Sequence, residues 1–133
     1  MAVVDSSLWV EFFRAGTPVQ VRRLVEPYVR ARDVALCEPV VFEILRAAPA
    51  VQRSTIESLF NLLPVLETPG NLWRDACRLG QKCAEAGFAV GGMDLLIAQI
   101  CIRHATRLIT LDRQFEQIAS VATLSVHLLE REE

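Results

Sequence analysis

Lysine and histidine are scarce in this 133-residue sequence. Lys82 is the only lysine among 14 basic residues, and the formal net charge is −2. A balance so close to neutral argues against a strongly basic surface that would bind nucleic acid by charge alone. The two histidines, His104 and His127, are far apart, and neither has a second histidine or a cysteine at ligand spacing. A zinc site is therefore not expected.

The sequence also lacks paired cysteines and long apolar runs. None of its four cysteines forms a Cys-x-x-Cys pair, which indicates free thiols rather than a metal knuckle. No apolar run approaches the roughly 18 residues that span a membrane. The N-terminus has no basic segment followed by a long apolar stretch, so it does not resemble a signal peptide. We therefore expect a cytoplasmic protein without membrane contact.

Short apolar runs alternate with longer helical patterns along the whole chain. Strands are expected at 2–5, 33–37, 65–68, 107–112 and 123–129. Helices are expected at 6–16, 18–32, 39–48, 50–63, 71–87, 93–105 and 113–119. This alternation, with a hydrophobic fraction of 52%, predicts a three-layer α/β/α fold with a central, mainly parallel sheet of four to five strands. We expect residues 1–133 to form a single domain.

Local signals refine two of these helices. Ser6 or Ser7 is expected to cap the first helix, because a hydroxyl can accept a hydrogen bond from a backbone amide of the first turn. Pro27 is expected to kink or interrupt the second helix, because proline has no amide hydrogen.

Four carboxylates stand in strongly apolar surroundings. Asp5 and Asp112 each follow an expected strand, and ligands bind at the carboxyl ends of strands in open parallel sheets. Glu43 lies within the apolar segment PVVFEILRAA, and Asp94 lies in the first turn of the most apolar helix. If the four share one pocket, their mutual repulsion requires a cation. Oxygen ligands without histidine or cysteine favour Mg²⁺ or Mn²⁺.

Each of these acids also has a purely structural interpretation. Asp5 and Asp112 could cap the helices that follow them, and Asp94 could interact with the amides of its own helix N-terminus. Glu43 could pair with Arg46 one turn later. As a group, however, four buried carboxylates are costly unless they are paired or bound to metal.

Four motifs around these acids resemble those of a known family. They read Val4-Asp5-Ser6-Ser7, Pro39-Val40-Val41-Phe42-Glu43, Gly91-Gly92-Met93-Asp94-Leu95-Leu96-Ile97-Ala98 and Thr110-Leu111-Asp112-Arg113-Gln114-Phe115. In this order and at this spacing, the sequence resembles PIN-domain ribonucleases over nearly its whole length. Its length and motif order are similar to those of the VapC toxins of bacterial toxin–antitoxin pairs.

The resemblance implies a metal-dependent endoribonuclease that cleaves RNA phosphodiester bonds with metal-activated water. The metal-binding and catalytic residues that it implies are Asp5, Glu43, Asp94 and Asp112, with Mg²⁺ or Mn²⁺ as the cofactor. The hydroxyls of Ser6 and Thr110 would orient the carboxylates or a metal-bound water. Gln114 stands where some relatives carry a further acid, which weakens the expectation of a carboxylate-rich second metal site.

The resemblance also implies three partners: the RNA substrate, a VapB-like antitoxin and a second copy of the chain in a homodimer. The antitoxin would lay apolar side chains along the N-terminal helices and direct a basic side chain at the carboxylates. The residues offered for the apolar contact, which could instead be plain core, are Leu8, Trp9, Phe12 and Phe13.

Three arginines lie near the expected site in the sequence: Arg14, Arg46 and Arg113. They are candidates for contacts with RNA phosphates, because the guanidinium group suits planar phosphate recognition. For each of them, a solvated or ion-paired role on the surface is the alternative.

Other classes of protein fit the sequence less well. A receiver domain of phosphotransfer signalling also surrounds Mg²⁺ with strand-end aspartates, but it needs a lysine at a late strand end, and Lys82 lies in a helical pattern. A haloacid-type phosphatase needs Asp-x-Asp after the first strand, where this chain has Asp5-Ser6-Ser7. A non-catalytic binding module with the same fold stays open.

Overall fold

A parallel sheet of four strands, in the order β2-β1-β3-β4, forms the centre of the computed structural model, which describes residues 1–131. The strands are β1 (Ala2–Val4), β2 (Val34–Ala35), β3 (Arg107–Thr110) and β4 (Val126–Leu128). Val3 of β1 lies opposite both Ala35 and Leu108, so β1 is paired along both edges. The expected α/β fold with a parallel sheet is confirmed.

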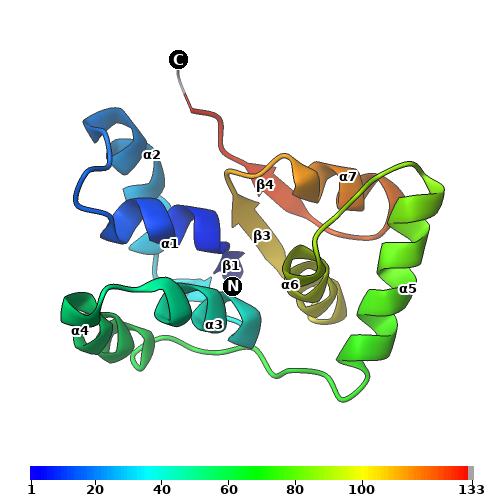
Figure 1. Cartoon of the computed structure of the whole chain (residues 1–133), viewed down its shortest axis with the longest axis horizontal. Coiled ribbons are helices and arrows are strands. Elements are labelled where there is room, and N and C mark those ends of the chain that lie inside the picture. The colour runs from blue at the N-terminus through cyan, green and yellow to red at the C-terminus, as the bar shows by residue number, and fades with distance from the viewer. Residues whose placement is uncertain (132–133) are drawn as a thin grey trace.

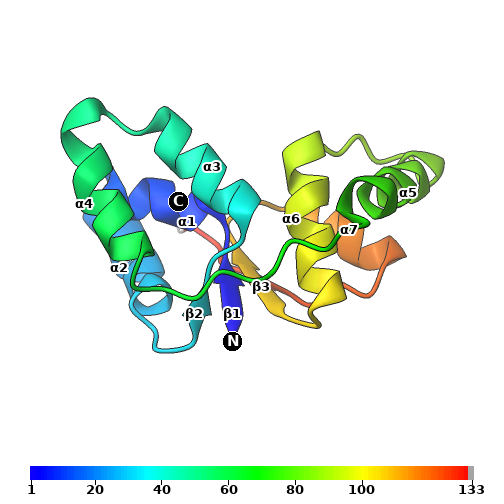
Figure 2. The ribbon, with the colours of Figure 1, turned by 90° about the horizontal axis from the view of Figure 1, so that it is seen from below.

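Helices lie on both sides of this sheet. Within residues 1–131 they are α1 (Ser6–Phe13), α2 (Val19–Val29), α3 (Glu38–Ala47), α4 (Ala50–Phe60), α5 (Leu72–Glu85), α6 (Gly92–Arg103) and α7 (Gln114–Val121). The first four helices gather on one side of β1 and β3, and α5, α6 and α7 gather on the other (Figures 1 and 2). Of the helices in the described part of the chain, none is long and apolar enough to cross a membrane.

The strand expected at residues 65–68 does not form. Val65 makes only an isolated parallel bridge with Leu36, fixed by hydrogen bonds of 2.8 Å from the Leu36 amide to the Pro64 carbonyl and from the Leu66 amide to the Leu36 carbonyl. The pairing stops there because the neighbouring chain enters helix α3 at Glu38.

The structure corrects the expected cap of the first helix and shows that Pro27 does not interrupt the second. Asp5, not a serine, is the N-cap of α1, and its carboxylate accepts a hydrogen bond from the Ser7 amide at 3.4 Å. Asp5 can do this because it directly follows β1, one residue before the helix begins. Helix α2 runs through Pro27 and ends two residues later at Val29, so the proline lies in the last turn.

The core is centred on β1 and the first helix. Val3 and Val4 are fully buried, as expected for a strand covered by helices on both faces. Trp9 of α1 is also fully buried, and its indole N–H donates to the Val4 carbonyl at 3.1 Å. Its ring stacks on Phe13, at a centroid distance of 5.8 Å, and meets the edge of Phe60 at 5.1 Å. Trp9 therefore joins α1 both to the sheet and to α4.

This burial corrects the expected antitoxin surface. Leu8 and Trp9 have no exposed surface, so neither is available to a partner. Phe12 and Phe13 are only partly buried and pack against the core.

We expect Trp9→Phe to lower the free energy of unfolding by about 1 to 3 kcal/mol, because it removes the hydrogen bond to the Val4 carbonyl and leaves a small cavity. Urea denaturation would measure the change. The matched control is Trp73→Phe at a position that is 75% exposed, where we expect a change within about 0.5 kcal/mol. Equal stability of the two variants would show that Trp9 does not anchor α1.

Candidate active site

The four acids predicted from the sequence gather at the carboxyl ends of β1 and β3. Asp5 directly follows β1, and its amide donates to the Ile109 carbonyl of β3 at 2.9 Å. Asp112 lies two residues beyond the end of β3. Helices α3 and α6, which contribute Glu43 and Asp94, lie on either side of β1 at this end of the sheet (Figure 2).

A network of hydroxyl groups fixes the position of Asp5. Its Oδ2 accepts hydrogen bonds from the hydroxyls of Ser7 and Thr110, both at 2.8 Å. The Thr110 hydroxyl in turn accepts from the Asp112 amide at 2.9 Å, and the Ser7 hydroxyl accepts from the Leu111 amide at 3.1 Å. These contacts join the end of β1 to the end of β3, so the two aspartates are positioned together.

Two further contacts orient Glu43 and Asp112. The Ser6 hydroxyl donates to Glu43 Oε1 at 2.7 Å, and the Gln114 amide donates to Asp112 Oδ1 at 2.9 Å. The structural interpretations of Asp5 and Asp112 are therefore partly correct, since each carboxylate accepts a hydrogen bond from a backbone amide of the helix that follows it. These hydrogen bonds involve one carboxylate oxygen of each residue, so a structural role and a ligand role are compatible.

Asp94 combines partial burial with the influence of the other three acids. Its side chain is half-buried on the helix face that it shares with the buried residues Ile97, Ala98 and Cys101. Burial, followed by the negative charges of Asp5, Asp112 and Glu43, raises the pKa of Asp94 to about 7. Asp94 therefore lies close enough to the other three acids for their charges to act on it.

No cationic side chain within residues 1–131 forms an ion pair with any of the four acids. The pairing proposed between Glu43 and Arg46 is thus not made. Burial also raises the pKa of Asp5, against the lowering effect of the hydrogen bonds from Ser7 and Thr110. The site carries negative charge that the described part of the protein does not neutralise.

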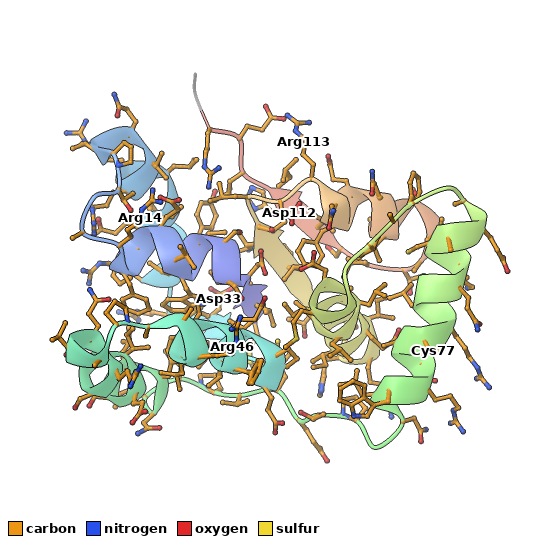
Figure 3. The ribbon with its side chains drawn as sticks, viewed as in Figure 1. Arg14, Asp33, Arg46, Cys77, Asp112 and Arg113 are labelled. Atoms are coloured by element: carbon orange, nitrogen blue, oxygen red, sulfur yellow. The ribbon has the colours of Figure 1, made fainter. Side chains whose placement is uncertain are left out.

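The three candidate arginines are exposed and point to different surroundings (Figure 3). Arg14, at the far end of α1, pairs with Glu11 at 3.0 Å. Arg113 directly follows Asp112 and pairs with Glu130 at 3.3 Å. The Arg46 guanidinium lies 5.8 Å from the centroid of the Phe42 ring, one turn away on α3. Arg14 lies outside the acidic site, whereas Arg46 and Arg113 flank acids in the sequence.

The donors at the site are oxygen atoms. Cys37 and Cys101 are buried nearby, and burial followed by neighbouring charge raises the pKa of Cys37 to about 12, so its thiol stays protonated. Burial likewise raises the pKa of Cys101. Among residues 1–131, no three His, Cys, Asp or Glu side chains are grouped closely enough to hold a metal ion between them. The four acids surround one region without converging on a single point.

Ser7 is the site residue whose contacts the sequence analysis missed. It was considered only as a helix cap, yet its hydroxyl contacts Asp5 and the Leu111 amide. Its place two residues after Asp5, on the first turn of a helix that starts at a strand end, was the available signal.

Comparison with known proteins identifies the family of this chain. Residues 2–121 match the PIN domain family model. The VapC ribonuclease Mb1587 of Mycobacterium bovis is 37% identical over 130 residues, which cover 93% of this chain and 96% of the relative. The chain therefore belongs to the PIN domain family, and this relative places it among the VapC ribonucleases.

Solved structures show the same fold at lower sequence identity. One is VapBC2 from Rickettsia felis, bound to a DNA fragment from its promoter. It contains a chain that matches with a TM-score of 0.70 and 15% sequence identity, and the match covers 97% of this chain and 98% of that chain. VapBC-5 from Mycobacterium tuberculosis is described as a member of the VapBC family of toxin–antitoxin systems. It contains a chain that matches with a TM-score of 0.65 and 24% sequence identity, and the match covers 96% of this chain and 98% of that chain.

The raised pKa of Asp94 predicts a pH-dependent effect of Asp94→Asn on stability in the presence of a chelator. Because the folded-state pKa of about 7 exceeds the ordinary value of 3.8, ionisation of Asp94 destabilises the fold increasingly as the pH rises between these two values. We expect Asp94→Asn to raise the free energy of unfolding by on the order of 1 to 2 kcal/mol at about pH 8, after screening by solvent is allowed for, and to change it little at about pH 4.

Urea denaturation at both pH values would measure this difference, with the exposed Asp33→Asn as the matched control. A loss of stability of similar size at both pH values would instead indicate that Asp94 has a structural role.

Proposed function

We propose that this chain is a metal-dependent endoribonuclease and the toxin of a VapBC-type toxin–antitoxin pair. The observation that carries the proposal is the group of four carboxylates at the strand ends, which has no cationic partner in the described part of the chain. The 37% identity to a protein named a VapC ribonuclease supports the activity.

The residues at the site fit a hard divalent cation chemically. Mg²⁺ and Mn²⁺ prefer oxygen ligands, and carboxylates supply both the oxygens and the compensating charge. The ligands that we propose are Asp5, Glu43, Asp94 and Asp112. No three of these side chains are grouped closely enough in the structure to hold an ion between them, so an ion would be held only after Asp94, which has no orienting hydrogen bond among those described above, moves toward the others.

When bound, such an ion would neutralise charge on the scissile phosphate and lower the pKa of the attacking water. The chain's own residues hold the carboxylates for this task. Thr110 and Ser7 fix Asp5, and Ser6 fixes Glu43, by hydroxyl hydrogen bonds of 2.7 to 2.8 Å. These contacts leave the remaining carboxylate oxygens for the ion, so we propose orienting roles for all three hydroxyls.

We also propose the wider setting that the sequence analysis expected: one domain over residues 1–133, action on RNA in the cytoplasm, and a homodimer. Arg46 and Arg113 remain candidates for contacts with RNA phosphates because they follow or adjoin the acids. Arg14 is the weakest of the three candidates, because it lies at the far end of α1 and pairs with Glu11.

We expect RNA cleavage by the purified protein to require Mg²⁺ or Mn²⁺ and to stop with EDTA. Asp5→Asn, Glu43→Gln and Asp112→Asn should each lower the cleavage rate by roughly 100-fold or more, because each removes a charged ligand while keeping the side-chain shape. Gel analysis of a labelled cellular RNA would measure the rates.

The matched control is Glu57→Gln on the exposed surface of α4, which should keep the wild-type rate. Full cleavage in EDTA would contradict the metal mechanism. Folded protein that cleaves no RNA with either metal would favour the alternative, a non-catalytic binding module.

An antitoxin partner is supported by the VapBC complexes with the same fold. An apolar pocket of ≈ 330 Å³ between α1, α3 and α4, lined by Phe13, Ile44 and Pro49 among others, offers a surface for apolar side chains of such a partner. We propose this pocket as the antitoxin surface in place of Leu8 and Trp9, which are buried.

We expect expression of the chain alone to arrest growth, and co-expression of the product of the adjacent small reading frame to relieve the arrest and give a stable complex. The Asp5→Asn variant should bind the same product without arresting growth. An active, folded enzyme that neither harms the cell nor binds this product would rule out the toxin–antitoxin role.

A further inference from the structure

A pocket of ≈ 410 Å³ lies between α5, α6 and the end of α7. These helices gather on the side of the sheet opposite α1, α3 and α4, which line the apolar pocket proposed for the antitoxin (Figure 2). The two pockets share no lining residue, and none of the four acids lines either of them. The pocket is therefore a separate surface, and metal binding does not account for it.

Two exposed cations line this pocket. Arg78 and Lys82 are four residues apart on α5, so their side chains project from the same face of the helix. Within residues 1–131, neither of them forms an ion pair. Asp75 also lines the pocket, but its Oδ1 lies 4.0 Å from Nε of Arg74, which offsets its charge. The pocket therefore keeps an excess of positive charge, although the whole chain carries a net charge of −2.

The Lys82 end of the pocket lies toward the acidic site. Helices α5 and α6 pack closely there, since a Cβ added at Gly80 would lie 2.9 Å from Leu95 Cδ1. Leu95 directly follows Asp94, and Gly80 is two residues before Lys82. Gln99, on the α6 wall of the pocket, is about one turn further along that helix. The pocket therefore begins near the turn that carries Asp94 and continues away from the acids.

Neutral polar groups complete the lining. Gln99 offers an amide group that can both donate and accept hydrogen bonds, and Thr123, which follows α7, offers an exposed hydroxyl. Together with arginine and lysine, such side chains contact phosphate oxygens and sugars in complexes with nucleic acids. The pocket thus combines cations with groups that suit a sugar–phosphate backbone.

We propose that this pocket holds the phosphate backbone of the RNA strand that is cut at the acids, at nucleotides outside the scissile bond. This inference rests on the proposed function. A strand cut at the acids has to continue across the neighbouring surface, and charge complementarity directs this polyanion to Arg78 and Lys82. Contacts with phosphates carry no sequence information, so the pocket would strengthen RNA binding independently of the bases.

The test measures binding of a labelled single-stranded RNA to the Asp112→Asn variant in Mg²⁺ by fluorescence anisotropy, over a series of salt concentrations. Adding the double substitution Arg78→Gln/Lys82→Gln removes both charges and keeps polar side chains. We expect binding at low salt to weaken by about tenfold. The slope of log affinity against log salt should become shallower by about 1.4, because each phosphate contact with a single strand contributes about 0.7.

The matched control is Arg23→Gln/Arg32→Gln in the same background. These two exposed arginines lie in and just after α2, on the other side of the sheet, and their removal changes the net charge by the same amount. The control should keep the RNA affinity and the salt slope, and thermal melting would verify that both double variants fold. Equal losses of affinity in the two double variants would overturn the proposal, because net charge alone would then explain the effect.

An acidic protein segment is the rival occupant of this pocket. If Arg78→Gln/Lys82→Gln leaves the RNA affinity unchanged and weakens binding of the co-expressed antitoxin, the pocket holds such a segment and the proposal is wrong. Failure of the proposed function has a different signature. In that case the wild-type protein would cleave no RNA with Mg²⁺ or Mn²⁺, while the specific loss of RNA affinity in Arg78→Gln/Lys82→Gln would persist.

Discussion

The parallel pairing of β1 between β2 and β3 is the constraint on which the rest of the structure depends. Parallel strands bring their carboxyl ends to one edge of the sheet, and the chain places Asp5 and Asp112 just beyond two neighbouring strands. The Asp5 amide is itself bonded to the Ile109 carbonyl. Backbone pairing of β1 with β3, extended by this hydrogen bond, thus brings the chain segments that carry the two acids side by side.

The acids combine structural and functional demands that the sequence presents as alternatives. Asp5 caps α1 through Oδ2, and the same oxygen accepts hydrogen bonds from the hydroxyls of Ser7 and Thr110. Hydrogen bonds of this kind favour the charged carboxylate and partly offset the cost of its burial. At Asp94, ionisation keeps a free-energy cost, because burial and three neighbouring carboxylates raise its pKa to about 7. The proposed cation would remove that cost, so folding and metal binding are expected to be coupled.

Position along α3 and α6 decides which surface each side chain joins. Glu43 and Asp94 face the acidic site, whereas the residues just before them, Phe42 and Met93, line a separate apolar pocket of ≈ 340 Å³ between α3, α5 and α6. Successive residues on a helix point in directions about 100° apart. One pair of helices can therefore present ligands to one side and an apolar, aromatic wall to the other.

The sequence by itself determined the alternation of strands and helices and the parallel sheet, because buried strands and helix periodicity are local patterns. It also singled out Asp5 and Asp112 as carboxylates at strand ends, and Glu43 and Asp94 as carboxylates within apolar helices, as candidate ligands. Tertiary structure decided which patterns were realised. Residues 65–68 have strand-like composition but make one bridge, because their partner chain turns into α3 at Glu38. The same holds for Ser7, whose hydroxyl reaches Leu111, and for Trp9, which is core rather than surface. Contacts between residues of different elements depend on how those elements pack, and no local pattern encodes that.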